Sequence, residues 1–136
     1  MIKEKDELLM QDMERTESLM RECRLCPRNC GVNRMAGERG VCGMTAEIAA
    51  ARAALHMWEE PCISGTEGSG AIFFSGCSMG CCFCQNREIA AGRQGNAVNV
   101  EQLADIFLKL QGQNANNINL VTAGHFLPQT VAALHL

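Results

Sequence analysis

The sequence lacks the features that would place the protein at a membrane or outside the cell. No stretch approaches the roughly 20 consecutive apolar residues of a membrane-spanning helix. The opening residues, 1–7, contain no apolar core of the kind that a signal peptide requires. Basic residues are not in excess, with 12 Lys and Arg against 15 Asp and Glu, so neither nucleic acid nor an anionic membrane is indicated as a partner. We therefore expect a cytoplasmic protein.

Aromatic residues are scarce, since the chain has no tyrosine and one tryptophan, whereas cysteine is abundant, with nine residues among 136. The hydrophobic fraction of 47% and the charged fraction of 20% are those of a packed globular protein. Disulfides are rare in the reducing cytoplasm, and these cysteines are clustered at short intervals. The excess of cysteine therefore predicts metal or iron–sulfur ligation.

The cysteines fall into two groups. The first group has four members with spacings of two, three and eleven residues: Cys23, Cys26, Cys30 and Cys42. The second group has three members with spacings of three and two residues: Cys77, Cys81 and Cys84. Cys82 lies inside the second group, and Cys62 stands alone between the groups. We expect two separate metal sites.

Two segments precede the regular part of the chain. Residues 1–22 predict an amphipathic helix, with one face formed by Leu9, Met13, Thr16 and Met20. Residues 23–62 form a cysteine-rich module, in which the first cysteine group and its loops hold too few apolar residues to build a core. The state of residues 44–58 stays open, because a high helix propensity there competes with the neighbouring cysteines and turn.

Residues 63–136 predict alternating strands and helices. The apolar run 71–74 is typical of a buried parallel strand, and its carboxyl end opens into the second cysteine group. Asn99 and Gln102 predict a helix cap, Gly112 a helix end, and Pro128 the start of a further helix. A second apolar strand is expected over 118–121. This order predicts an α/β fold with parallel strands and a right-handed crossover.

The second cysteine group has the number of ligands that suits an open iron–sulfur cluster. Three thiolates on one loop can hold a cubane cluster, because its iron ions favour soft sulfur ligands. Three protein ligands leave one iron of a [4Fe-4S] cluster free for an exogenous ligand. A catalytic metal site likewise keeps one coordination position open, whereas a structural site is closed. The spacing therefore predicts a cluster that binds a further molecule.

These residues resemble the radical S-adenosylmethionine superfamily, and specifically the branch related to pyruvate formate-lyase activating enzymes. The resemblance is carried by residues 77–84, including the aromatic Phe83 before the last cysteine, and by the segments 26–31, 58–65, 84–86 and 117–122. It implies that a partial (β/α)6 barrel follows the cysteine-rich module, and that residues 63–136 are the start of this barrel.

The resemblance also implies cofactors and partners. Cys77, Cys81 and Cys84 would hold the [4Fe-4S] cluster, and the open iron would bind S-adenosyl-L-methionine. The reduced cluster would cleave this molecule to a 5′-deoxyadenosyl radical, with an external electron donor and a glycyl radical enzyme as the protein substrate. Phe83 would pack beside the cluster or the adenine. After the second strand only Thr122 and His125 match the pattern expected for the branch.

Other interpretations of the cysteines stay open. The second group could be a structural zinc site with Cys62 or His125 as its fourth ligand. The first group offers a closed set of four ligands for zinc or for a second [4Fe-4S] cluster, and free structural thiols are the alternative. Five arginines near the first group indicate a solvated basic rim or a docking face for an acidic partner: Arg21, Arg24, Arg28, Arg34 and Arg39.

The length of the chain bears on its activity. The residues beyond Gly70 suffice for about two βα units at roughly 30 residues each. We therefore expect the chain to be the front portion of a larger enzyme. A non-catalytic metal-binding fragment, with zinc or iron–sulfur, is the alternative to a radical S-adenosylmethionine oxidoreductase or activase.

Overall fold

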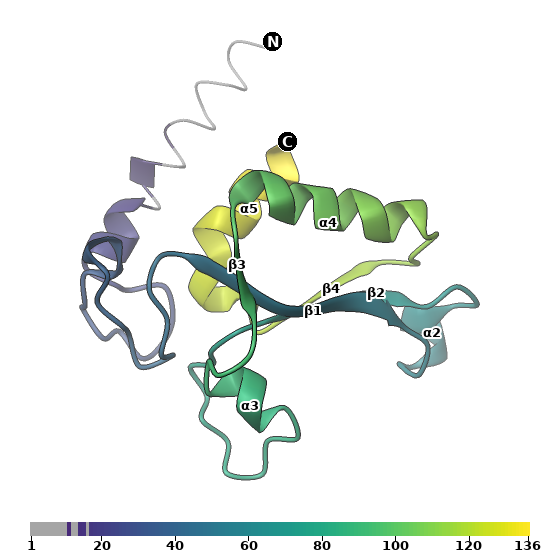
Figure 1. The fold of residues 1–136 in the computed structure, drawn as a ribbon, viewed down its shortest axis with the longest axis horizontal. Coiled ribbons are helices and arrows are strands. Elements are labelled where there is room, and N and C mark those ends of the chain that lie inside the picture. The colour runs from purple at the N-terminus through teal and green to yellow at the C-terminus, as the bar shows by residue number, and fades with distance from the viewer. Residues whose placement is uncertain (1–10, 12–13, 16) are drawn as a thin grey trace.

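The protein is built around a four-stranded mixed sheet (Figure 1). The structure, a computed structural model, describes residues 11, 14–15 and 17–136. The strands are β1 (Ile48–His56), β2 (Ser69–Phe74), β3 (Asn96–Val98) and β4 (Ile118–Val121), in the spatial order β3-β1-β2-β4. The helices are α2 (Pro61–Ser64), α3 (Arg87–Ala90), α4 (Val100–Gly112) and α5 (Leu127–His135), with 3-10 turns at Arg34–Ala36 and Ala123–Phe126. The fold class is α/β, as expected.

Strands β2 and β4 form the parallel pair that the sequence predicts. Their register runs from Gly70 opposite Ile118 to Phe73 opposite Val121, and α4 lies between them in the chain. Because the strands are parallel, their carboxyl ends lie at the same edge of the sheet. The second cysteine group follows β2, and the turn that contains His125 follows β4. The pairing therefore brings these two segments to one edge.

Strand β1 is the main feature that the sequence leaves open. It runs antiparallel to β2 from Ala50 to His56 and also pairs with β3. Its alanines favour a helix, but pairing on both sides and burial of Ile48 in the core outweigh this local preference. The sheet therefore crosses the division expected at residue 62, and the described strands form an open mixed sheet. The partial barrel stays a prediction.

Helix α4 begins and ends as predicted. The Asn99 side chain accepts a hydrogen bond from the Gln102 amide at 2.7 Å, and the Gln102 side chain accepts one from the Asn99 amide at 2.9 Å. This reciprocal capping box satisfies two backbone donors that the first turn leaves unpaired. Helix α5 carries Pro128 in its first turn, where the missing backbone donor costs nothing.

The core lies between the sheet and the helices α4 and α5, which lie together on one side of it (Figure 1). Ile72 and Phe74 of β2 are fully buried, as are Leu103 of α4 and Phe126 before α5. Cys42 and Met44 belong to the same buried cluster. The cysteine-rich module is therefore packed against the sheet.

The helix expected over residues 1–22 falls partly outside the described residues, since Leu9, Met13 and Thr16 are not among them. Residues 17–21 are helical, and Met20 is buried. The Met20 sulfur accepts a hydrogen bond from the Gln129 side chain of α5 at 3.3 Å. In the part of the chain that the structure describes, no helix is long and apolar enough to span a membrane.

The packing of α4 can be tested with two leucines of the same helix. Leu103 is fully buried, whereas Leu108 is 62% exposed. We expect Leu103→Ala to lower the free energy of unfolding by about 2–5 kcal/mol, because it removes buried contacts and leaves a cavity. Leu108→Ala should change it by no more than about 0.5 kcal/mol. Urea denaturation of both variants measures the difference, and equal effects would contradict this placement of the helix.

Candidate metal centre

The loop that carries the second cysteine group is fixed by backbone contacts as soon as β2 ends. The Ser75 amide donates to the Ala49 carbonyl at 2.8 Å, and its hydroxyl donates to the Gln94 carbonyl at 2.6 Å. The Gly76 amide then donates to the Ile89 carbonyl of α3 at 2.9 Å. These bonds on both sides hold the chain in place immediately before Cys77.

The three predicted cysteines of this group line one pocket of about 210 Å³. The other lining residues are Gly80, Arg87, Ala90 and Ala91. The Met79 amide donates a hydrogen bond to the Cys77 sulfur at 3.4 Å. Gly80, with a φ of 65°, has no side chain to fill the space beside the sulfurs. The pocket thus presents three soft donors and one basic side chain from a single loop and α3.

This donor set fits an iron–sulfur cluster, whose iron ions prefer thiolate ligands. The volume of the pocket, about 210 Å³, is below the roughly 300–1,000 Å³ of pockets that enclose organic ligands. A larger hollow of about 480 Å³ lies by β3 and the start of α4, but none of its lining residues is a cysteine or histidine. Over the described residues, no three Cys, His, Asp or Glu side chains converge tightly enough to hold a single metal ion.

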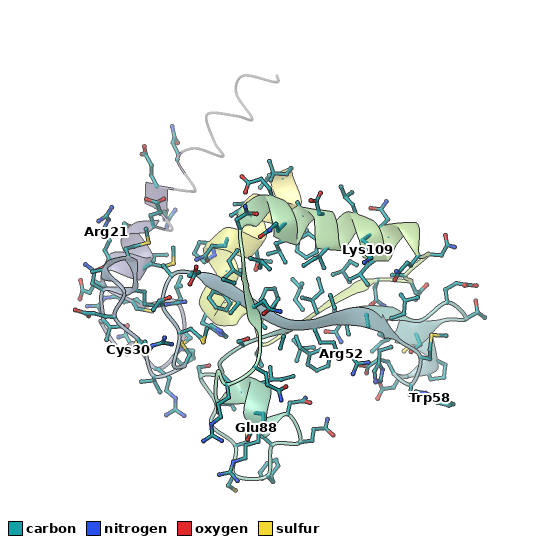
Figure 2. All side chains as sticks on the ribbon, viewed as in Figure 1. Arg21, Cys30, Arg52, Trp58, Glu88 and Lys109 are labelled. Carbon is teal, nitrogen blue, oxygen red and sulfur yellow. The ribbon has the colours of Figure 1, made fainter. Side chains whose placement is uncertain are left out.

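The remaining residues near this group lie outside the pocket. Cys82 is exposed and is not among the lining residues. Phe83 is 86% exposed and does not line the pocket either. Cys62 is exposed on α2, next to the segment that begins with the 90% exposed Trp58. Figure 2 shows Trp58 at the opposite end of the molecule from Cys30.

The first cysteine group has a more enclosed environment. Cys23 and Cys42 are buried, and Cys26 and Cys30 are partly buried. The Val41 amide, which donates to the Cys30 sulfur, lowers the pKa of this thiol, with burial opposing it and the Val32 amide and Cys23 thiol assisting. Burial raises the pKa of Cys42, against the effect of the Met44 amide.

The two cysteine groups are in direct backbone contact. The Cys77 amide donates to the Cys42 carbonyl at 3.2 Å. Arg28 reaches from the first group to the loop of the second, where it donates to the Ser78 carbonyl at 2.7 Å and to the Met79 carbonyl at 3.1 Å. The sequence predicts two separate sites but not that they adjoin.

Not all five arginines form a solvated basic rim. Arg34 is only 1% exposed, and it donates to the carbonyls of Thr45 and His125. Its guanidinium carbon lies 5.5 Å from the centre of the Phe126 ring. The rim interpretation is therefore wrong for Arg34, because the turn Arg34–Ala36 directs this side chain into the molecule.

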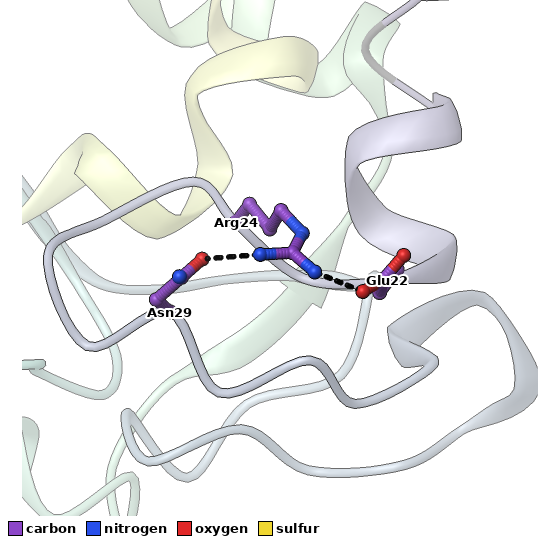
Figure 3. Close-up of polar contacts among 3 residues, drawn as sticks. All are labelled: Glu22, Arg24 and Asn29. Atoms are coloured by element: carbon purple, nitrogen blue, oxygen red, sulfur yellow. Dashed lines mark hydrogen bonds and ion pairs between the residues drawn. The ribbon is translucent and has the colours of Figure 1, made fainter.

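Arg24, by contrast, makes only local contacts (Figure 3). It lies between Glu22, with which it forms an exposed ion pair, and Asn29, to whose side-chain oxygen it donates at 3.4 Å. Exposed pairs of this kind contribute little to stability. Arg24 and Arg28 thus lie close together in the sequence, but Arg24 contacts residues of its own segment and Arg28 contacts the loop of the second cysteine group.

His125 is buried, and it is not among the residues that line the pocket. Its Nε2 lies 2.8 Å from the Ser75 carbonyl oxygen, two residues before Cys77. Burial lowers the pKa of His125, which the Ser75 carbonyl opposes and Arg34 assists. The neutral ring therefore donates to Ser75 and supports the start of the loop.

A comparison with protein families identifies the domain that contains this pocket. The model of the 4Fe-4S single cluster domain matches residues 63–136, which is more than half of the chain. The chain belongs to this family. The 4Fe-4S single cluster domain therefore includes β2, the three-cysteine loop, α4, β4 and α5, whereas the first cysteine group and β1 precede it.

A search of curated proteins found a similar protein in an archaeon. An uncharacterized protein of Methanocaldococcus jannaschii is 36% identical to this chain over 86 residues, which are 63% of this chain and 24% of that protein. The chain thus spans about a quarter of the length of this relative. No solved structure matches the chain. The comparisons support a 4Fe-4S cluster-binding domain and name no reaction.

The start of the 4Fe-4S loop can be tested with two glycines that both have a positive φ. A Cβ on Gly76, whose φ is 81°, would overlap the Met44 side chain and lie 2.6 Å from the Cys42 carbonyl oxygen. A Cβ on Gly80 would meet nothing within 4 Å.

We expect Gly80→Ala to cost roughly 1–2 kcal/mol, from the left-handed backbone alone. Gly76→Ala should cost about 1–3 kcal/mol more, because it also forces the two cysteine groups apart. Urea unfolding measures both values, and an equal cost would contradict the close approach at Gly76.

Proposed function

We propose that the three-cysteine loop holds a [4Fe-4S] cluster with one open iron, and that the protein uses it to cleave S-adenosyl-L-methionine reductively. The carrying observation is that three of the described cysteines, and no fourth, line the pocket at the end of β2. Each sulfur of Cys77, Cys81 and Cys84 would bind one iron, which leaves the fourth iron to an exogenous ligand.

The chemistry that the bound group would supply is transfer of one electron to the sulfonium of S-adenosyl-L-methionine, which breaks a carbon–sulfur bond and yields a 5′-deoxyadenosyl radical. The residues of the loop prepare the position for this group. The Met79 amide donates a hydrogen bond to the Cys77 sulfur, and the Arg87 guanidinium would offset the negative charge of three cluster-bound thiolates.

The edge of the sheet around the pocket also suits a ligand. Open α/β sheets bind ligands outside the carboxyl ends of their parallel strands, and here those ends belong to β2 and β4. Thr122 connects the two ends, since its hydroxyl donates to the Phe74 carbonyl at 3.1 Å and its backbone is left-handed with a φ of 60°. Thr122 also matches the resemblance to the activating-enzyme branch.

The partners in this proposal rest on that resemblance. An external electron donor reduces the cluster, and a backbone glycine of a glycyl radical enzyme is the substrate from which hydrogen is abstracted. The loop around Cys81 is exposed, so a protein donor can approach it. The chain spans about a quarter of the length of its relative. We therefore assign residues of this chain to cluster binding, and none to binding of the protein substrate.

The proposal predicts the iron content of cysteine variants. After anaerobic reconstitution, the protein should bind iron and sulfide in equal amounts at the loop, and Cys77→Ala, Cys81→Ala and Cys84→Ala should each lose this content. Cys82→Ala is the matched control, because Cys82 lies in the same loop outside the pocket. Iron and acid-labile sulfide analysis measures the effect, and an unchanged content in the first three variants would contradict the assignment.

Formation of 5′-deoxyadenosine tests the reaction itself. The reduced protein should convert S-adenosyl-L-methionine to this product, and the three cysteine variants should not. Cluster binding without any product would instead support the alternative of a non-catalytic iron–sulfur fragment.

A further inference from the structure

The Arg28 side chain reaches from the cysteine-rich module to the loop that carries the second cysteine group. Its Nε donates to the Ser78 carbonyl at 2.7 Å, and its Nη2 donates to the Met79 carbonyl at 3.1 Å. These two carbonyls are consecutive, and they lie between Cys77 and Cys81, the first two of the proposed cluster ligands. One planar guanidinium therefore binds two successive peptide groups of the loop.

The peptide group that joins Ser78 to Met79 is hydrogen-bonded at both of its ends. Its carbonyl oxygen accepts from Arg28, and its N–H, which belongs to Met79, donates to the Cys77 sulfur at 3.4 Å. Because a peptide group is planar, the direction of its carbonyl fixes the direction of its N–H. The two hydrogen bonds also polarise one another, so the guanidinium makes this N–H a stronger donor. Arg28 thus acts on the Cys77 sulfur through one peptide group.

Arg28 provides the long-range hydrogen bonds of residues 78–80 in the part of the chain that the structure describes. Among the described residues, no other group donates to the carbonyls of Ser78 and Met79. Packing does not restrain this segment either, because a Cβ on Gly80 would meet nothing within 4 Å and Met79 is 68% exposed. The orientation of the peptide group therefore depends on Arg28.

The charge of Arg28 is not offset by an acidic side chain of the described residues. The ion pairs found there involve Arg24, His56 and Arg93, and none includes Arg28. Its guanidinium therefore contributes a positive charge next to the loop, in addition to its two hydrogen bonds.

We propose that Arg28 is a positioning residue of the cluster loop. It directs the N–H between Ser78 and Met79 at the Cys77 sulfur and thereby raises the reduction potential of the cluster. This inference rests on the proposed assignment of the cluster to the three cysteines of the pocket. Hydrogen bonds to the sulfurs and net charge are among the factors that set the potential of an iron–sulfur cluster. An N–H directed at a ligand sulfur favours the reduced state, because it offsets the negative charge that the added electron brings.

The sign of the expected effect separates this role from a general loosening of the loop. Loss of the directed N–H and of the positive charge both disfavour the reduced cluster, so the potential becomes more negative. Loosening of the loop would instead admit water to the cluster, and water stabilises the more negative, reduced state. That change would make the potential more positive.

Redox titration of the anaerobically reconstituted full chain tests the role of Arg28. In Arg28→Ala, reduction of the cluster should be roughly tenfold less favourable than in the wild type, a negative shift of about 59 mV for one electron. Arg28→Lys keeps the charge but loses the planar fork that reaches two carbonyls, so it should shift the potential less in the same direction.

Arg24→Ala is the matched control for the titration. Arg24 lies in the same segment and is also exposed, and its side chain bonds only to Glu22 and Asn29 (Figure 3). This variant should leave the potential unchanged. An unchanged or more positive potential in Arg28→Ala would overturn the inference. Because Arg28 is exposed, neither of its substitutions removes a contact of the core.

The positioning of the loop is also tested without a cluster, in the full chain kept reduced and free of iron. Backbone order parameters from nuclear magnetic resonance should be near the rigid value of about 0.85 for the amides of Met79 and Gly80 in the wild type. In Arg28→Ala they should fall below about 0.6, and in Arg24→Ala they should stay near the wild-type value. Equal order parameters in the wild type and in Arg28→Ala would overturn the inference.

The two measurements separate this inference from the proposed function. A wild-type chain that binds no cluster at the three cysteines would contradict the proposed function, and the order parameters would then decide whether Arg28 positions the loop. A wild-type chain that binds the cluster, together with an unshifted potential in Arg28→Ala, would overturn the role of Arg28 and leave the cluster assignment intact.

Discussion

The contact at Gly76, where the two cysteine groups meet, is the constraint on which the candidate site depends. Strand β2 ends against Cys42 and Met44 of the cysteine-rich module, so closely that Gly76 has no room for a side chain, and the next amide, of Cys77, donates to the Cys42 carbonyl. The His125 ring contacts the same stretch through a hydrogen bond with the Ser75 carbonyl oxygen. Because contacts from three sides hold residues 75–77, the loop that follows begins at a fixed point, and its three cysteines line a single pocket.

Arginine side chains lie at both cysteine groups. Arg28 and Arg34 both belong to the cysteine-rich module, but the first holds the exposed loop and the second is buried beside His125 and Phe126. Arg87 adds a basic group to the pocket itself. At this position Arg87 would offset the negative charge of thiolates that hold a cluster. Two arginines of the module, Arg28 and Arg34, therefore hold other segments of the chain in place, in addition to any role of the basic residues at the surface.

Local patterns in the sequence predict the part of the fold that follows residue 63. The apolar run before Cys77, the Asn99–Gln102 cap and Pro128 each specify an element through nearest neighbours, and all three elements are found there. Strand β1 could not be predicted in this way, because its alanines prefer a helix and only pairing with β2 and β3 makes it a strand. The same limit applies to the site. Spacing predicts which cysteines share a loop, but the contacts of Arg28 and Arg34 join residues far apart in the chain and leave no local pattern.

The proposed function requires that three thiolates leave one iron of the cluster open to S-adenosyl-L-methionine. Electron paramagnetic resonance of the anaerobically reconstituted and reduced protein tests it most directly, because a ligand on one iron changes the signal of the whole cluster. We expect a [4Fe-4S]⁺ signal whose g values shift when S-adenosyl-L-methionine is added, and we expect the signal to be lost in the Cys81→Ala variant. A cluster signal that is identical with and without S-adenosyl-L-methionine would contradict it.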